Sequence, residues 1–231
     1  MKAMIFAAGL GTRLQPITNN IPKALVPYKN RPLLQITIEK LINAGIDDIV
    51  INVHHFSNLI IDFLAKNNNF NAKIKISDET SQLLDTGGGL YNAKSLLDSH
   101  LFLVHNVDII SDLNINELIN QHNQSKSIIT LAVQDRPSDK KLYFDTQNNC
   151  LSFWRNENSG QEKKSRNCNN TKGYAYSGIF VANYEIFNFM QEGVYSIIDT
   201  FLKVAKNKEV TFFDHSNTFW RDMGKPSSFL D

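Results

Sequence analysis

The stretch AMIFAAGLGTRLQP, residues 3–16, decides the fold of this chain. Its first part, residues 3–8, is a short apolar run, which is typical of a strand buried on both faces of a parallel sheet. Such a start could also be read as a short signal peptide, but Gly9, Gly11 and Arg13 interrupt it too early for a good apolar segment. We therefore expect a first strand that stops at Gly9 and turns into a glycine-rich loop.

Apolar runs and amphipathic segments alternate over the first half of the chain. Strands are expected at 3–8, 48–53, 72–76 and 101–105. Helices are expected at 32–44, 57–66, 88–97 and 114–124. Strands that alternate with helices predict an α/β fold with a doubly wound, mostly parallel central sheet of the Rossmann-like kind.

The pattern changes after about residue 126, where strands follow one another with few helices between them. Strands are expected at 127–133, 141–145, 151–154, 174–181, 209–213 and 219–222, and a helix at 195–206. The polar segment 155–173 predicts an exposed loop. We expect a small antiparallel extension packed on the parallel part, within one domain over 1–231 whose halves are 1–125 and 126–231.

Composition excludes several classes of protein. The chain has 231 residues, 42% of them hydrophobic and 20% charged, which predicts a folded globular protein. Its net charge of +1 gives no excess of positive charge for binding nucleic acid or a membrane surface. No apolar run reaches the roughly 18 to 20 residues of a membrane span. The two cysteines, Cys150 and Cys168, predict reduced thiols and a cytoplasmic protein rather than a disulfide framework or a four-ligand zinc site.

The glycine loop has the features of an anion site. Gly9 and Gly11 allow a tight turn and a close approach of backbone N–H groups, and Arg13 and Lys23 add two cations. A dinucleotide fingerprint is excluded because its third glycine position is Leu14, and no Gly-Lys-Ser/Thr follows for a Walker A loop. A plain structural turn is the remaining alternative. Since a turn does not explain both cations, a phosphate site is the preferred interpretation.

This loop, together with PKALVP at 22–27, resembles the signature of the sugar-1-phosphate nucleotidyltransferases, the NDP-sugar pyrophosphorylases. Five further segments are similar to the family in the same order: RPLLQ at 31–35, LLDTGGGL at 83–90, HNVD at 105–108, YSGI at 176–179 and WRDMGKP at 220–226. The TGGG stretch is most similar to the short members, the N-acetylmuramate-1-phosphate uridylyltransferases and the mannose-1-phosphate guanylyltransferase-like proteins. The resemblance implies an enzyme that condenses an NTP with a sugar 1-phosphate, giving NDP-sugar and pyrophosphate.

The resemblance also implies roles for individual residues. Arg13 and Lys23 would be catalytic. Nucleotide contacts would come from Ala8, Gly9, Gly11, Thr12, Arg13, Lys23, Thr86, Gly87 and Gly88. Sugar contacts would come from Asn106, Tyr176, Ser177 and Gly178. Secondary candidates are Asp78 and Glu79 beside the nucleotide, and Lys140 and Lys141 at the sugar phosphate.

Two aspartates complete the expected site. Asp108 follows the strand at 101–105, and the carboxyl ends of parallel strands are where α/β sheets bind ligands. Asp222 lies in the WRD segment, and in the family both positions are metal ligands. Two carboxylates, phosphate oxygens and water suit Mg²⁺, so Mg²⁺ is the expected cofactor. The ionised sugar phosphate needs no general base, so catalysis would rest on alignment and charge neutralisation.

Several alternatives stay open. The resemblance to the short members favours UTP with N-acetylmuramic acid 1-phosphate or another hexose 1-phosphate, and GTP with mannose 1-phosphate is the alternative. A metal-dependent glycosyltransferase would normally need Asp-x-Asp, whereas Ile109 and Ile110 follow Asp108. A non-catalytic nucleotide-sugar-binding regulatory homologue is the third possibility. The expected partners are the small-molecule substrates, with no nucleic acid or membrane, and the protein would be a monomer or homodimer.

Overall fold

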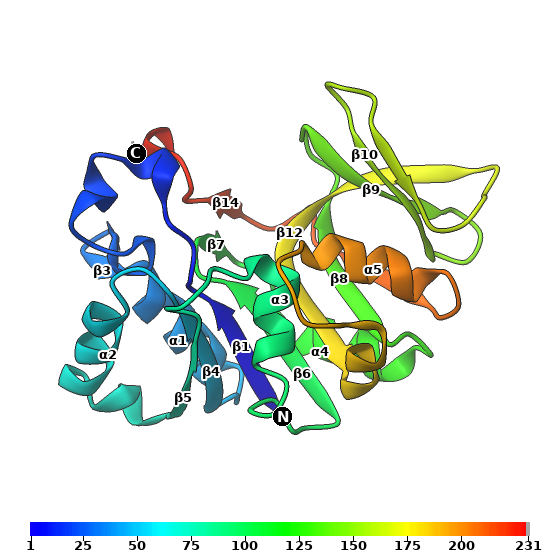
Figure 1. Cartoon of the computed structure of the whole chain (residues 1–231). Helices are drawn as coiled ribbons and strands as arrows, with labels where there is room; N and C mark the ends of the chain where they lie inside the picture. Colours follow the sequence, from blue (N-terminus) through cyan, green and yellow to red (C-terminus); the bar gives the residue numbers. More distant parts are fainter. Residues whose placement is uncertain (230–231) are drawn as a thin grey trace.

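The parallel part of the sheet forms as the apolar runs predict. A computed structural model describes residues 1–229 of the chain. Four parallel strands lie in the order β5-β4-β1-β6, with β1 in the middle (Figure 1). They are β1 (Lys2–Phe6), β4 (Asp48–Val53), β5 (Lys73–Asp78) and β6 (Leu101–Asn106). All four expected strands are therefore confirmed, with small differences at their ends.

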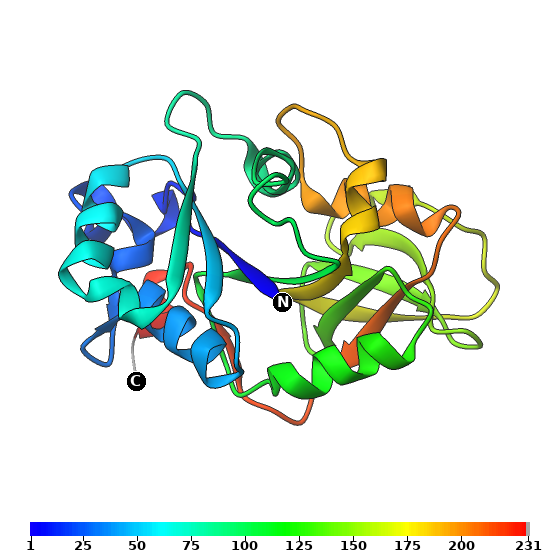
Figure 2. The ribbon, with the colours of Figure 1, turned by 90° about the horizontal axis from the view of Figure 1, so that it is seen from below.

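Both faces of this sheet are covered, so the α/β, doubly wound expectation is confirmed. Ala3 and Ile5 of β1 pack into one buried cluster, and Met4 and Phe6 pack into another. The first cluster includes side chains of α1 (Leu33–Asn43), α2 (Ser57–Lys66) and α4 (Ile115–Gln124). The second includes side chains of α3 (Asp85–Asn92) and α5 (Ile197–Ala205). Figure 2 shows α4 and α5 on opposite sides of the sheet.

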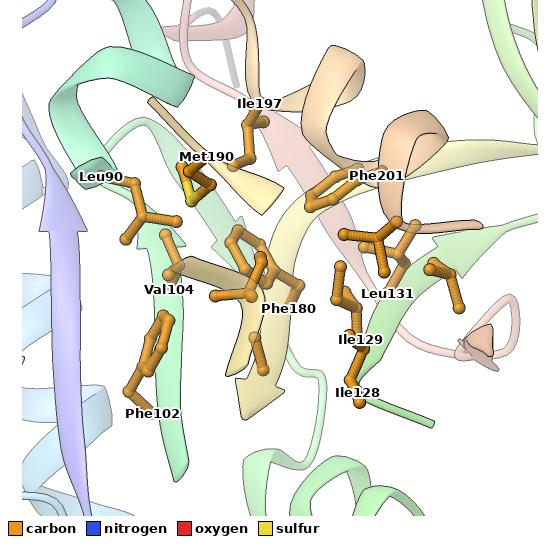
Figure 3. Close-up of a cluster of buried hydrophobic side chains, with 14 of the residues drawn as sticks. Leu90, Phe102, Val104, Ile128, Ile129, Leu131, Phe180, Met190, Ile197 and Phe201 are labelled. Atoms are coloured by element: carbon orange, nitrogen blue, oxygen red, sulfur yellow. The ribbon is translucent and has the colours of Figure 1, made fainter. Parts of the chain in front are cut away.

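The second half of the chain continues the same sheet, mostly in antiparallel pairing. The long strand β12 (Thr171–Asn183) pairs with β6, β8 and β9 along different parts of its length. The other strands of this half are β8 (Ile129–Gln134), β9 (Lys140–Asp145), β10 (Leu151–Asn156), β11 (Glu162–Lys164) and β13 (Val210–Asp214). Figure 3 shows the core here, where Phe180 of β12 meets Phe201 of α5 edge to face at 5.1 Å. The strand β12 thus joins the parallel and antiparallel parts of one sheet.

Short elements complete the fold and bring distant segments together. One small sheet pairs β7 (Ile109–Ser111) with β14 (Trp220–Asp222), and another pairs β2 (Pro27–Tyr28) with β3 (Arg31–Pro32). The 3-10 helices are Thr12–Leu14, Ile17–Asn19, Lys23–Leu25, Asn68–Asn71, Tyr184–Phe189 and Pro226–Phe229. None of the helices within residues 1–229 is long and apolar enough to span a bilayer.

Two expectations are wrong in detail. The helix expected at 88–97 begins three residues earlier and ends five residues earlier, so Gly87, Gly88 and Gly89 lie inside α3. A Cβ on Gly88 would stand 1.9 Å from the carbonyl oxygen of Gly193, so close packing, rather than flexibility, requires glycine there. The segment expected as a loop at 155–173 contains β11 and the start of β12. The polar sequence did not predict this strand because β11 lies at the edge of the sheet and buries few apolar side chains.

Candidate active site

Two cavities meet at the carboxyl end of β6. The smaller, of about 400 Å³, lies beside the first turn after β1 and is here called the glycine-loop cavity. The larger, of about 900 Å³, is here called the basic cavity, because Arg13, Arg136 and Lys141 are among its lining residues. Asn106 and Asp108 line both cavities. These two residues therefore form a wall that the two cavities share.

The glycine loop is held against the segment that carries Lys23. Gly11 has φ +67°, a left-handed conformation that favours glycine. A Cβ there would also stand 2.9 Å from Thr18 Cγ2 and 3.1 Å from Lys23 Cβ, so only glycine fits. Ala8 and Gly9 line the glycine-loop cavity, whereas Gly11 and Thr12 line neither cavity.

Lys23 and Asp108 form an ion pair at the junction of the cavities. Lys23 Nζ donates to Asp108 Oδ2, although 85 positions separate the residues. The Lys23 residue is only 9% exposed, so a shielded positive charge lies at the floor of the glycine-loop cavity. A lysine that is both buried and paired is suited to contact phosphate oxygens.

The returning chain brings Asp222 to the same place. Strand β14 pairs antiparallel with β7, with Asp222 opposite Ile109, and Met223 N donates to the Asp108 carbonyl oxygen at 2.8 Å. Both aspartates line the basic cavity. Arg13 lines it too, with its Nη2 4.0 Å from Asp222 Oδ2 and its side chain 57% exposed. The structure thus groups Arg13, Lys23, Asp108 and Asp222, which the sequence places far apart.

The triple glycine contributes less to the cavity than expected. Thr86 lines the glycine-loop cavity, but Gly87 and Gly88 do not. Their N–H groups donate to the Tyr195 carbonyl oxygen, at 2.8 and 3.4 Å. These donors therefore hold α3 against the segment before α5 and do not point at a ligand.

Two polar residues at the base of the glycine-loop cavity form a buried pair. Asn52 Nδ2 donates to Glu79 Oε1 at 2.7 Å, and Asn52 Oδ1 accepts from Ala7 N at 2.7 Å. Glu79 Oε2 also accepts from Leu84 N at 3.2 Å. Burial raises the pKa of Glu79, while these hydrogen bonds oppose the rise. Glu79 was a secondary candidate and Asn52 was missed, although each lies at the carboxyl end of a parallel strand, which could have identified it.

Three of the four expected sugar residues lie on strand β12, whose alternation directs their side chains to opposite faces, and the fourth ends β6. Tyr176, Gly178 and Asn106 line the basic cavity. The Tyr176 hydroxyl is buried with no hydrogen-bond partner within residues 1–229, and burial raises the pKa of Tyr176. Ser177 points the other way, and its Oγ lies 2.7 Å from His215 Nε2. The side chain of Ser177 therefore reaches neither cavity.

His215 makes the stability of this arrangement depend on pH. Burial lowers the pKa of His215 to about 4, against about 6.5 for an exposed histidine. Because the folded state disfavours the protonated imidazole, His215 contributes its full stabilisation above about pH 6.5. This contribution is lost as the pH falls toward 4. Unfolding in urea at pH 7 and pH 5 is expected to show a loss of about 2 kcal/mol that depends on this histidine. His215→Gln should be less stable at pH 7 and should lack that part of the decrease. An equal pH dependence in both proteins would contradict the assignment.

The comparisons with known proteins cover the chain almost completely. The nucleotidyl transferase family matches residues 2–231. Mannose-1-phosphate guanyltransferases of Aspergillus oryzae and Saccharomyces cerevisiae are each 32% identical over 100% of this chain. The chain spans 62% and 63% of the length of these two relatives.

Solved structures show the same fold. An inositol-1-phosphate CTP transferase from T. maritima has a TM-score of 0.79 at 16% identity, and covers 100% of this chain and 91% of that one. A UDP-glucose pyrophosphorylase from Acinetobacter baumannii also has a TM-score of 0.79, at 18% identity over 99% and 90% of the two chains. The glycine loop, the two cavities and the family match over residues 2–231 lead to one conclusion: this chain belongs to the nucleotidyl transferase family.

Proposed function

We propose that this protein condenses an NTP with a sugar 1-phosphate to give an NDP-sugar and pyrophosphate. The observation that carries the proposal is the meeting of the two cavities at Asn106 and Asp108. A nucleotide in the glycine-loop cavity and a sugar phosphate in the basic cavity would have their phosphates adjacent at this junction. Bringing two anions together requires positive charge, which Lys23 and Arg13 supply.

The residues support an in-line displacement at the α-phosphorus. An ionised oxygen of the sugar phosphate attacks, and pyrophosphate leaves with the electrons of the broken P–O bond. Lys23 would screen the charge where the two phosphates meet. Arg13, which lines the basic cavity, would bind the β- and γ-phosphates where they extend past the junction of the cavities, and would then bind the departing pyrophosphate. Since the nucleophile is already ionised, the site needs no general base, and alignment and charge account for catalysis.

Asp108 and Asp222 have the chemistry to hold Mg²⁺. Asp108 lies in the turn between β6 and β7, Asp222 lies at the end of β14, which pairs with β7, and both carboxylates line the basic cavity. Mg²⁺ takes one or two protein carboxylates and fills its shell with phosphate and water. When bound, Mg²⁺ would supply further charge neutralisation at the reacting phosphates.

For the base, two observations favour guanine over uracil, the base that the sequence analysis placed first. The fungal relatives at 32% identity are guanyltransferases by name. Glu79 lines the glycine-loop cavity and its two oxygens accept from Asn52 and Leu84, and in its ionised form this carboxylate offers a base only acceptors. Guanine presents two neighbouring donors, N1–H and N2–H, whereas uracil presents a single N–H between two acceptors. We therefore propose GTP as the nucleotide and a hexose 1-phosphate such as mannose 1-phosphate as the partner.

Glu79→Gln tests the base assignment. The amide replaces one acceptor oxygen with an N–H donor, which should oppose a guanine N–H and would instead donate to a uracil carbonyl oxygen. We expect kcat/KM with GTP to fall by about tenfold or more, and kcat/KM with UTP to fall less, because an unpaired donor at a binding edge costs about 1 to 3 kcal/mol. Asp78→Asn is the matched control, since Asp78 is exposed and lines neither cavity. An unchanged ratio of GTP to UTP efficiency would remove Glu79 from base selection.

The proposed function is tested by a matrix of NTPs against sugar 1-phosphates, read as pyrophosphate release. We expect release to require both substrates and a divalent cation, with GTP and mannose 1-phosphate the best pair. A glycosyltransferase would instead consume a nucleotide sugar and release a nucleotide without pyrophosphate. Nucleotide-sugar binding with no turnover in any pair would indicate a regulatory homologue and overturn the proposal.

A further inference from the structure

The basic cavity contains a rigidly held cation, Arg136, that the reaction outlined above does not use. Arg136 follows strand β8, and its guanidinium lies over the Trp220 ring, 3.6 Å from the centroid. Its Nη2 donates to the Tyr176 carbonyl oxygen at 3.3 Å, and its Nη1 donates to the Pro137 carbonyl oxygen at 3.4 Å. These contacts position the guanidinium at the wall of the basic cavity.

This charge has no carboxylate partner within 4 Å in the part of the chain that the structure describes. Several other cations pair with acidic side chains, but Arg136 forms no ion pair within residues 1–229. Its Nε is buried and has no hydrogen-bond partner there. Burial lowers the pKa of Arg136, and the charge of Asp222 opposes that change. A partly desolvated guanidinium without a carboxylate partner costs free energy. An anion bound from outside the chain would offset that cost by pairing with its charge.

The position of Arg136 indicates which anion this is. Trp220, on which it lies, is two residues before Asp222 in strand β14. Arg136 therefore lies near Asp222, shares the basic cavity with Asp108 and Asp222, and does not line the glycine-loop cavity. The planar guanidinium presents paired N–H donors whose geometry matches two oxygens of a phosphate.

We propose that Arg136 binds the phosphate group of the sugar 1-phosphate and positions its attacking oxygen, an inference that rests on the proposed function. One oxygen of that phosphate forms the new bond to the α-phosphorus. The bond from the α-phosphorus to the bridging oxygen of pyrophosphate breaks, and its electron pair leaves with pyrophosphate. Arg136 transfers no proton, because its role is to bind and orient the nucleophile.

Arg136→Met tests this role, since methionine keeps an apolar stem over Trp220 and removes the charge. We expect KM for the sugar 1-phosphate to rise about tenfold or more and kcat to fall, with KM for the NTP changed by less than about twofold. Arg136→Lys keeps a positive charge without the planar pair of donors, so its KM for the sugar 1-phosphate should lie between those of the wild type and Arg136→Met. Arg155→Met is the matched control, because Arg155 also lies over aromatic rings, at 5.6 and 5.8 Å, but lines neither cavity.

Inorganic phosphate distinguishes binding of the phosphate from binding of the sugar ring. At saturating NTP, its inhibition constant against the sugar 1-phosphate should rise in Arg136→Met by the same factor as KM. A rise in KM alone would show that Arg136 contacts the ring and would overturn the assignment. If the wild-type protein is active and both Arg136 variants keep their KM and inhibition constant within about threefold of the wild-type values, the inference is overturned and the proposed function stands. Absence of wild-type activity with every substrate pair would overturn both. Thermal melts confirm that each variant is folded.

Discussion

Asp108→Asn and Asp222→Asn are each expected to lower turnover by about a thousandfold, measured as pyrophosphate release at saturating Mg²⁺. Asparagine keeps the shape of the side chain but removes the charge that would hold the ion. Asp108 directly precedes β7, Asp222 ends β14, which pairs with β7, and both aspartates line the same cavity. Because they would act as a unit, the double mutant should be little worse than either single mutant.

The control for this prediction is Asp112→Asn. Asp112 is an exposed aspartate four positions after Asp108 that lines neither cavity, so its variant should keep near-normal turnover. Thermal melts should show folded protein in all variants. Turnover within about tenfold of wild type in either Asp108→Asn or Asp222→Asn would show that the ion is held elsewhere, since tenfold corresponds to only about 1.4 kcal/mol.

Arg13→Ala is expected to lower kcat by about a hundredfold, with a smaller effect on KM for the sugar 1-phosphate. The reason is that Arg13 would stabilise charge that develops on the departing pyrophosphate. Arg31→Ala is a close control, because the Arg31 side chain is 54% exposed, against 57% for Arg13, and pairs with Glu39 away from both cavities. Turnover of Arg13→Ala within about threefold of wild type would remove Arg13 from the catalytic role.

The parallel part of the fold was predictable because its signals are local. The run at 3–8 had to be buried on both faces, and the helix at 57–66 begins and ends where its amphipathic pattern does. The helix beginning after Asn114 was also predictable, since the Asn114 side chain accepts from Asn116 N and Glu117 N as an N-cap. The sequence of the edge strand β11 gives no such signal, because this strand is held by its backbone pairing with β10 and not by an apolar pattern of its own.

The site was predictable only as far as backbone order determines it. Asp108 and Asn106 follow from the end of strand β6, whereas the ion pair of Lys23 with Asp108 depends on tertiary packing across 85 positions. The directions of Gly87 and Ser177 also depend on distant partners, Tyr195 and His215. Arg136 was missed for the same reason, because the contact that positions it, with Trp220, is made by a segment more than eighty positions away in the sequence.

The central claim, that a sugar phosphate attacks the α-phosphorus of an NTP, is tested most directly by isotope transfer. The protein is incubated with GTP, Mg²⁺ and mannose 1-phosphate carrying ¹⁸O in its non-bridging phosphate oxygens, and the products are analysed by mass spectrometry. The account predicts that the nucleotide sugar retains all of the label and that pyrophosphate carries none. Label in pyrophosphate, or formation of GDP and inorganic phosphate in place of a nucleotide sugar, would contradict it.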